Sequence, residues 1–116
     1  MVLRITNNVQ DYDDTTHCIT LSQFGQKSYH PYIASKVWDK VYIDCTDETP
    51  RGFIKQLLKR SKVIPVFDVK NLTQRSIQIL CEIVPDQSAA LRIAFTKRDG
   101  SLEKLLEELR HTYWKE

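Results

Sequence analysis

Three stretches of the chain share one pattern of apolar and polar residues. Apolar runs with the residue types of buried strands lie at 41–43, 63–67 and 91–95. Helices are expected in the segments that follow these runs, at 50–60, 73–84 and 102–113, because their apolar residues recur at helical spacing. Strands that alternate with helices form βαβ units with parallel strands. Such sheets bind ligands at the carboxyl ends of their strands, where a site is expected.

The first forty residues predict two more strands and a short helix. Strands at 3–5 and 18–21 flank a polar segment that suits the loop of an antiparallel hairpin. Residues 22–28 are expected to form a loop, and a short helix is expected to begin near Pro31. The whole pattern predicts one α/β domain over 1–116. Its central mixed, mostly parallel sheet is flanked by helices in the order β-β-α-β-α-β-α-β-α.

The helix expected at 73–84 has apolar residues on two sides. Thr73 suits its N-cap, as Thr49 followed by Pro50 suits the start of the preceding helix. Ile79 and Ile83 lie off the main apolar stripe. They predict either a contact with a second copy of the chain, as in a homodimer, or a helix that is buried deeply within one copy.

Composition is that of a water-soluble globular protein. The chain has 116 residues, of which 41% are hydrophobic and 28% charged, with a net charge of +2. No apolar stretch approaches the roughly 18 residues of a membrane span, so no membrane contact is predicted. Cys18, Cys45 and Cys81 are widely spaced, which favours free thiols in a reducing, cytoplasmic compartment. Of the three thiols, Cys45 is the candidate for a reactive one, because it precedes an expected helix start.

The motifs of the common enzyme classes are missing from the sequence. Three glycines, at 25, 52 and 100, cannot form a dinucleotide-binding or nucleoside-triphosphate loop. The three histidines are not spaced as metal ligands, and no nucleophile elbow occurs. No cofactor and no metal site is predicted, and the question of catalysis stays open.

One acidic pattern resembles that of PD-(D/E)xK nucleases. Asp44 ends one expected strand, and Asp68 and Lys70 end the next. The resemblance implies two acids that hold magnesium and a lysine that activates water. The nuclease family joins these strands by a hairpin, whereas a helix is expected here at 50–60. The alternative is that the two acids cap loops. Lys97 and Arg98, after the last expected strand, are candidate phosphate contacts.

Basic residues gather on the helix expected at 50–60. Arg51, Lys55 and Lys59 are spaced four residues apart, which places them on one side of the helix. Clustered cations favour phosphates or acidic partners. The alternative is the ordinary charged outer face of an amphipathic helix.

The predicted order of elements resembles that of STAS domains, the fold of bacterial anti-sigma-factor antagonists. Val41-Tyr42-Ile43-Asp44 is similar to the family's central strand. The resemblance implies a phosphorylatable hydroxyl where the next helix begins, and Thr46 and Thr49 stand there. The family's Asp-Ser-Ser/Thr-Gly string is missing, and Asp47 and Glu48 resemble a fixed negative charge instead.

Two functions are therefore expected from different classes. The first is a non-enzymatic regulatory or protein-interaction module whose surface combines residues 46–51 with the exposed side of the basic helix. The second is a nucleotide- or nucleic-acid-binding protein, or a metal-dependent hydrolase or nuclease, in which the catalytic candidates are Asp44, Asp68 and Lys70. Its phosphate contacts are Lys97 and Arg98.

Overall fold

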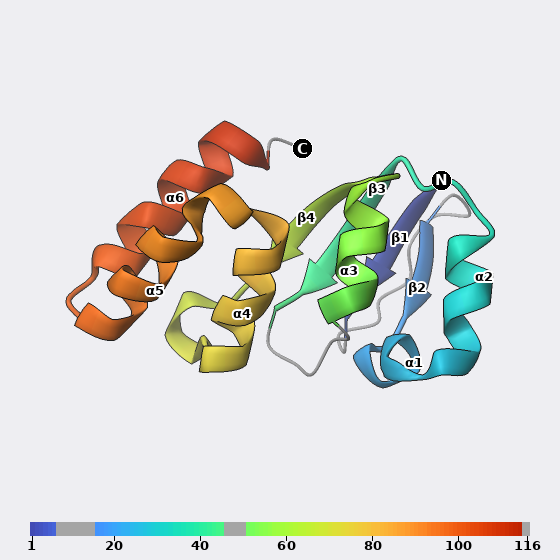
Figure 1. Cartoon of the computed structure of the whole chain (residues 1–116), viewed down its shortest axis with the longest axis horizontal. Helices are drawn as coiled ribbons and strands as arrows, with labels where there is room; N and C mark the ends of the chain where they lie inside the picture. Colours follow the sequence, from blue (N-terminus) through green and yellow to red (C-terminus); the bar gives the residue numbers. More distant parts are fainter. Residues whose placement is uncertain (7–15, 46–50, 115–116) are drawn as a thin grey trace.

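The chain folds around a four-stranded, all-parallel sheet (Figure 1). The computed structural model describes residues 1–6, 16–45 and 51–114. The strands are β1 (Val2–Ile5), β2 (Thr16–Ile19), β3 (Lys40–Asp44) and β4 (Lys62–Val66), in the spatial order β2-β1-β3-β4. The helices are α1 (Leu21–Gly25), α2 (His30–Ala34), α3 (Arg51–Leu58), α4 (Gln74–Ile83), α5 (Ser88–Lys97) and α6 (Ser101–Tyr113). Single 3-10 turns are η1 (Lys27–Tyr29), η2 (Val69–Asn71) and η3 (Pro85–Gln87). The predicted α/β class and the sheet flanked by helices are confirmed.

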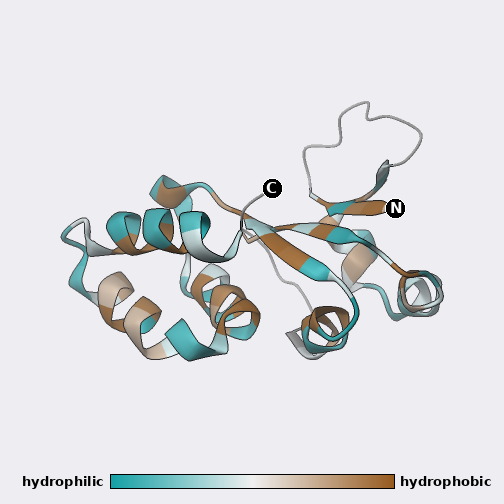
Figure 2. Cartoon of the chain, turned by 90° about the horizontal axis from the view of Figure 1, so that it is seen from above, coloured by the Kyte–Doolittle hydropathy of each residue, from teal (hydrophilic) through white to brown (hydrophobic). Residues whose placement is uncertain are grey.

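One face of the sheet forms the centre of the core. Leu3 and Ile5 of β1 pair in register with Val41 and Ile43 of β3, and all four are fully buried. Residues paired in a parallel sheet point to the same face, so these side chains form one apolar layer. Helices α1, α2 and α3 lie against this face (Figure 2). On the opposite face, the guanidinium of Arg4 lies 4.2 Å from the ring centroid of Tyr42.

The first two strands are parallel, so the predicted antiparallel hairpin is wrong. Ile5 pairs with Ile19, and both strands run in the same direction. Ten residues separate Ile5 from Thr16, and an extended chain of that length spans about 33 Å. That length is enough to return to the amino edge of a four-residue strand. A polar segment of this size therefore does not distinguish a hairpin loop from a crossover.

The strand predicted at 91–95 is also wrong, because these residues lie in the middle of α5. The segment begins with Ala89 and Ala90, which have the highest helix propensity. Leu91 and Ala94 are buried at helical spacing, whereas Ile93 is 58% exposed. The run Leu-Arg-Ile-Ala-Phe looks like a strand over five residues, but its inward side follows the period of a helix.

The predicted helices are confirmed, and the described residues contain two helices that the sequence does not predict, α1 and α5. Helices α3, α4 and α6 match the segments predicted at 50–60, 73–84 and 102–113. The side chain of Thr73 accepts a hydrogen bond from the amide of Ser76 and so caps α4. The expected loop at 22–28 contains α1, whose capping box joins Thr20 to Gln23. The predicted cap at Thr49 and Pro50 lies outside the described residues.

The second apolar side of α4 is covered within the chain. Ile79 and Ile83 are both buried, and α4 contacts α3, α5 and β4. Deep burial therefore accounts for the two-sided pattern of this helix, and no second copy is needed to cover it.

The last three helices lie beyond β4, which is an edge strand (Figure 1). The carbonyl of Val66 accepts a hydrogen bond from the amide of Cys45, so the backbone of Pro65 points away from β3. Proline, which has no amide hydrogen, is tolerated at such an edge. We call β1–β4 with α1–α3 the sheet region and α4–α6 the helical region. Trp114, just after α6, returns to β4 and packs against Phe67, with ring centroids 6.1 Å apart. No helix in the described ranges is long and apolar enough to cross a membrane.

Candidate functional site

The strand order defines the edge where a ligand site is expected. The chain passes from β1 to β2 on one side and then to β3 on the other, which makes the gap between β1 and β3 the topological switch point. Asp44 lies there, at the carboxyl end of β3. The predicted binding residues Thr46, Asp47, Glu48 and Thr49 follow it and lie outside the described residues.

The carboxylate of Asp68 has a local structural task. It accepts hydrogen bonds from the backbone amide of Lys70 at 3.1 Å and from Nδ2 of Asn71 at 2.8 Å. Both oxygens of Asp68 are thereby used to cap η2, as the loop-capping alternative expects. Among the described residues, no three acidic, cysteine or histidine side chains are grouped to hold a metal ion.

Lys97 and Arg98 do not follow a strand, because the predicted strand before them is helix α5. Lys97 is the last residue of α5, and Arg98 comes next with a left-handed backbone (φ 53°). Arg98 lines a surface depression together with Phe95 and Gln74, at the start of α4. The expected arrangement, in which these cations follow a strand and face its carboxyl edge, is therefore corrected.

The predicted basic residues of α3 differ in their surroundings. The ammonium of Lys55 lies 3.3 Å from the carboxylate of Glu82 in α4, so this residue links the sheet region to the helical region. Lys59, one turn later, is exposed near the end of α3. Arg51 is the first residue of α3.

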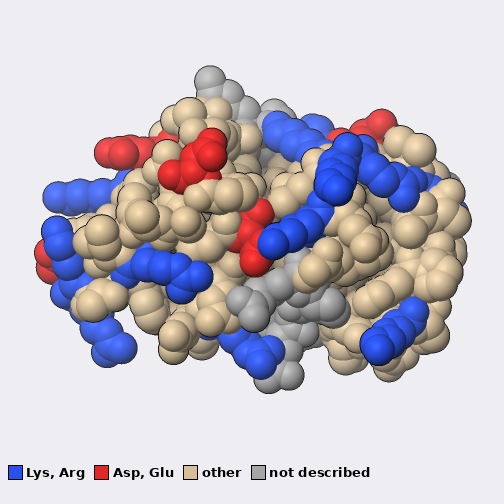
Figure 3. Space-filling view, viewed as in Figure 1, with Lys and Arg blue, Asp and Glu red and all other residues tan. Residues whose placement is uncertain are grey.

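A cluster of cations is found at the amino edge of the sheet. We call it the basic cluster, and its members are Lys36, Lys40, Lys59, Arg60 and Lys62. Lys40 and Lys62 are the first residues of β3 and β4 and are paired in register. Figure 3 shows lysine and arginine side chains gathered over the upper end of α3. Paired residues of adjacent strands point to the same face, so the side chains of Lys40 and Lys62 leave the sheet on the same side.

Arg60 holds the basic cluster together. Its guanidinium donates hydrogen bonds to the carbonyls of Ala34, at 2.5 Å, and Lys36, at 3.1 Å. These carbonyls lie at the end of α2, where the helix leaves acceptors unsatisfied and carries a partial negative charge. The bonds bring the end of α2 to the turn before β4, so cations distant in sequence become neighbours. The acid within this stretch, Asp39, pairs with the N-terminal amine, and this hydrogen bond lowers the pKa of its carboxyl.

A groove separates α2 from α3 on the helical face of the sheet. We call it the α2–α3 groove; its volume is about 470 Å³, and it is lined by Lys27, His30, Pro31, Ala34, Gly52, Phe53 and Gln56. The imidazole of His30 stacks on the ring of Phe53, with centroids 4.3 Å apart and planes within 6°. Nε2 of His30 donates to the carbonyl of Phe24 at 3.1 Å, which fixes the orientation of the imidazole.

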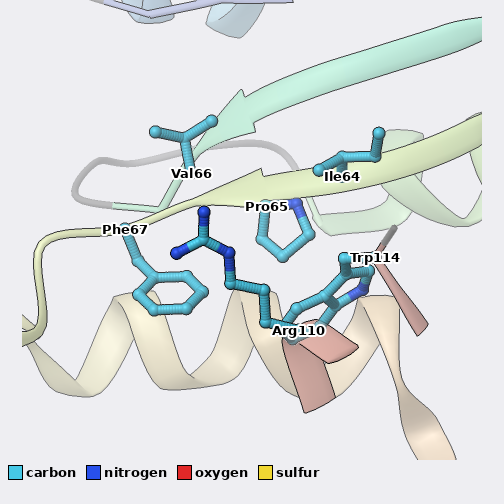
Figure 4. A pocket seen from close by; sticks show the side chains of 6 residues that line it. All are labelled: Ile64, Pro65, Val66, Phe67, Arg110 and Trp114. Carbon is cyan, nitrogen blue, oxygen red and sulfur yellow. The ribbon is translucent and has the colours of Figure 1, made fainter. Parts of the chain in front are cut away.

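A second cavity lies between β4 and α6 (Figure 4). Figure 4 shows Arg110 of α6 extending toward β4 between Phe67 and Pro65, with Trp114 beside them. The volume of this cavity is about 170 Å³, below the roughly 300 Å³ at which small-molecule sites begin. We interpret it as the joint between the helical region and β4.

The three cysteines are unsuited to nucleophilic chemistry. Cys45 is fully buried, and burial together with the nearby charge of Asp44 raises the pKa of its thiol far above the usual range. Burial also raises the pKa of the Cys81 and Cys18 thiols. A nucleophilic cysteine needs a lowered pKa, so the candidacy of Cys45 as a reactive thiol is not supported.

The site residues that the sequence missed come from separate stretches. An excess of Lys and Arg over 51–75 signals part of the basic cluster, but nothing in the sequence joins Lys36 and Lys40 to it. No protein-family model, no curated protein and no solved structure matches this chain. The STAS resemblance stays a prediction.

Proposed function

We propose that this protein is a non-enzymatic interaction module, which binds an acidic segment of a partner protein through the basic cluster. The observation that carries the proposal is the convergence of cations from two stretches of the chain, 36–40 and 59–62. Lys36 follows α2, Lys59 lies at the end of α3, and Lys40 and Lys62 begin adjacent strands. Cations held close together at an edge attract an anionic segment and orient it as it approaches.

The surroundings of the basic cluster favour a protein partner over a nucleic acid. Val37, beside Lys36, is 68% exposed and offers an apolar contact of the kind that protein interfaces use. Single-stranded nucleic acids need open aromatic rings for stacking. The ammonium of Lys36 occupies one face of the Tyr32 ring, 4.8 Å from its centroid, although Tyr32 is 42% exposed, and Trp38 is buried.

The backbone supports binding through a rigid surface. The guanidinium of Arg60 fixes the end of α2, and Lys40 and Lys62 stand on hydrogen-bonded strands. A partner therefore meets cations whose positions are already set, which reduces the entropy lost on binding. The predicted binding residues at 46–49 lie outside the described residues, and the proposal does not need them.

The test uses a defined acidic probe and two matched charge reversals. The probe is a fluorescent peptide of ten residues that alternates Glu and Asp around one central Leu. The cluster variant is Lys36→Glu with Lys59→Glu, and the control is Lys97→Glu with Lys104→Glu, which changes the net charge equally on exposed sites of the helical region. We expect the cluster variant to bind at least tenfold more weakly in fluorescence anisotropy, and the control to bind as the parent does.

Salt and a second probe complete the test. Binding to the parent protein should weaken as ionic strength rises, because the contacts are charged and exposed. Equal weakening by the cluster variant and the control would show that only net charge matters and would overturn the proposal. Tighter binding of a single-stranded oligonucleotide of equal charge would favour the nucleic-acid alternative instead.

A further inference from the structure

We propose that the α2–α3 groove is a binding site for a small planar aromatic anion, that is, an aromatic ring that carries a phosphate or a carboxylate. This site shares no residue with the basic cluster, and it does not depend on the proposed function. The volume of about 470 Å³ lies within the range of small-molecule sites. Four features of the lining residues indicate the class of ligand.

The first feature is a rigid aromatic platform. The imidazole of His30 and the ring of Phe53 are stacked in almost parallel planes, and the ring of Phe53 also packs on Phe24, with centroids 5.4 Å apart. The hydrogen bond from Nε2 of His30 to the carbonyl of Phe24 prevents the imidazole from turning. A flat ring that enters the groove meets the half-buried imidazole of His30, which Phe53, itself only 7% exposed, holds in a fixed orientation before binding.

The second feature is the space that Gly52 leaves open. A methyl group at this position would meet no atom of the described residues within 4 Å, so nothing in the described structure requires glycine there. Glycine weakens a helix relative to alanine, and Gly52 lies in the first turn of α3. The groove gains width from this residue, because Pro31 and Ala34, on the opposite wall, are also small.

The third feature is the charge of the lining. Among the described residues that line the groove, Lys27 carries the formal charge, and no carboxylate lines it. Gln56, one turn after Gly52, supplies an amide that can both donate and accept hydrogen bonds. A flexible ammonium beside an aromatic platform suits a ligand whose ring lies on the platform and whose anionic group reaches Lys27.

The fourth feature is the position of the groove in the fold. Helix α3 follows the carboxyl end of β3, and His30 is tied to α1, which follows the carboxyl end of β2. Figure 1 shows α2 and α3 running in the same direction, away from that edge. The groove thus begins beside the switch point between β1 and β3, where open parallel sheets bind ligands.

Two variants test the groove separately from the stability of the fold. Gly52→Leu extends a side chain from a position where a Cβ meets no described atom within 4 Å, and Ala89→Leu is its control on the exposed side of α5. Lys27→Gln removes the charge and keeps a polar side chain. The probes are adenosine monophosphate, indole-3-carboxylate, neutral adenosine and inorganic phosphate, and their dissociation constants are measured by amide chemical shifts in NMR spectra.

We expect at least one aromatic anion to bind, with its largest shifts at α2 and α3. Gly52→Leu should weaken that binding at least tenfold with an unchanged or raised melting temperature, whereas Ala89→Leu should not change the affinity. Lys27→Gln should weaken binding of the aromatic anion about tenfold and leave the affinity for adenosine unchanged. Tighter binding of the nucleotide identifies a phosphate ligand, and tighter binding of the indole identifies a carboxylate. Failure of both anions to bind, equal binding by Gly52→Leu, or equal shifts with inorganic phosphate alone would overturn the proposal.

Discussion

The sheet region and the helical region bring residues together in different ways. In the sheet region, Lys40 and Lys62 become neighbours because β3 and β4 pair in register, although a whole helix separates them in the sequence. In the helical region, α5 packs on α4 and α6, its neighbours in the sequence. Residues from distant segments meet mainly in the sheet region, and both proposed binding surfaces lie there. The comparison indicates that the sheet positions the candidate sites and that the helices α4–α6 complete the core.

The two regions are joined chiefly by α4, whose buried residues pack against α3 and β4. Two further contacts support this packing: Trp114 returns from α6 to Phe67, and Lys55 pairs with Glu82. These two further contacts can be removed separately. The resulting losses of stability should differ according to how deeply each contact is buried.

The largest effect is expected at Trp114, which anchors the helical region on β4. Its side chain is 5% exposed. Removal of a buried aromatic ring leaves a cavity and lowers the free energy of unfolding by about 3–5 kcal/mol, so Trp114→Ala should be severely destabilised in urea. The neighbouring Tyr113 is 44% exposed, and Tyr113→Ala should change stability by only about 0.5 kcal/mol. Similar losses in the two variants would show that the joint at β4 does not hold the helical region.

The next effect tests whether 91–95 is a helix or a strand. Leu91 is fully buried in α5, whereas Ile93 faces solvent. In a strand the two side chains would share a face, but on a helix they lie far apart around the axis. Leu91→Ala should therefore lower the free energy of unfolding by about 2–5 kcal/mol, and Ile93→Ala by about 0.5 kcal/mol or less. Comparable losses of stability in the two variants would contradict the helix and support the predicted strand.

The sequence predicted an element correctly where its pattern of apolar residues fits only one type of secondary structure. The strands β3 and β4 were predictable because β-branched residues filled a short apolar run, and α4 because ten residues of helical spacing follow the cap of Thr73. The prediction of a strand at 91–95 was wrong because five residues that alternate in polarity fit the period of a strand and that of a helix. The predicted direction of β2 was wrong because the alternation of apolar and polar residues shows which face of the sheet a side chain occupies. It does not show whether two strands are parallel or antiparallel.

The candidate sites were less predictable than the fold. The exposure of Lys59 follows from helical periodicity, but the pairing of Lys55 with Glu82 requires the packing of α3 on α4. The bond from Arg60 to Ala34 joins segments that have no local signal. The α2–α3 groove depends on the spacing of two helices, and spacing between helices leaves no pattern in a single sequence.

The smallest effect is expected at the ion pair between the two regions. The side chain of Lys55 is 65% exposed and that of Glu82 is 22% exposed, and pairs of this kind contribute about 0.2–1 kcal/mol. A double-mutant cycle with Lys55→Met and Glu82→Gln isolates the coupling, since each variant removes the pair without adding a charge. The control cycle replaces His111 and Glu107, a pair within α6 that lies at 3.1 Å. The side chains of the control pair are 75% and 63% exposed, both more than Glu82, so the control coupling should be the smaller of the two, and the Lys55–Glu82 coupling should fall with added salt. A Lys55–Glu82 coupling of zero at low salt would show that Trp114 and the packing of α4 on α3 and β4 hold the two regions together without this ion pair. A coupling well above about 1 kcal/mol would show that the charges are more shielded from water than their exposure indicates.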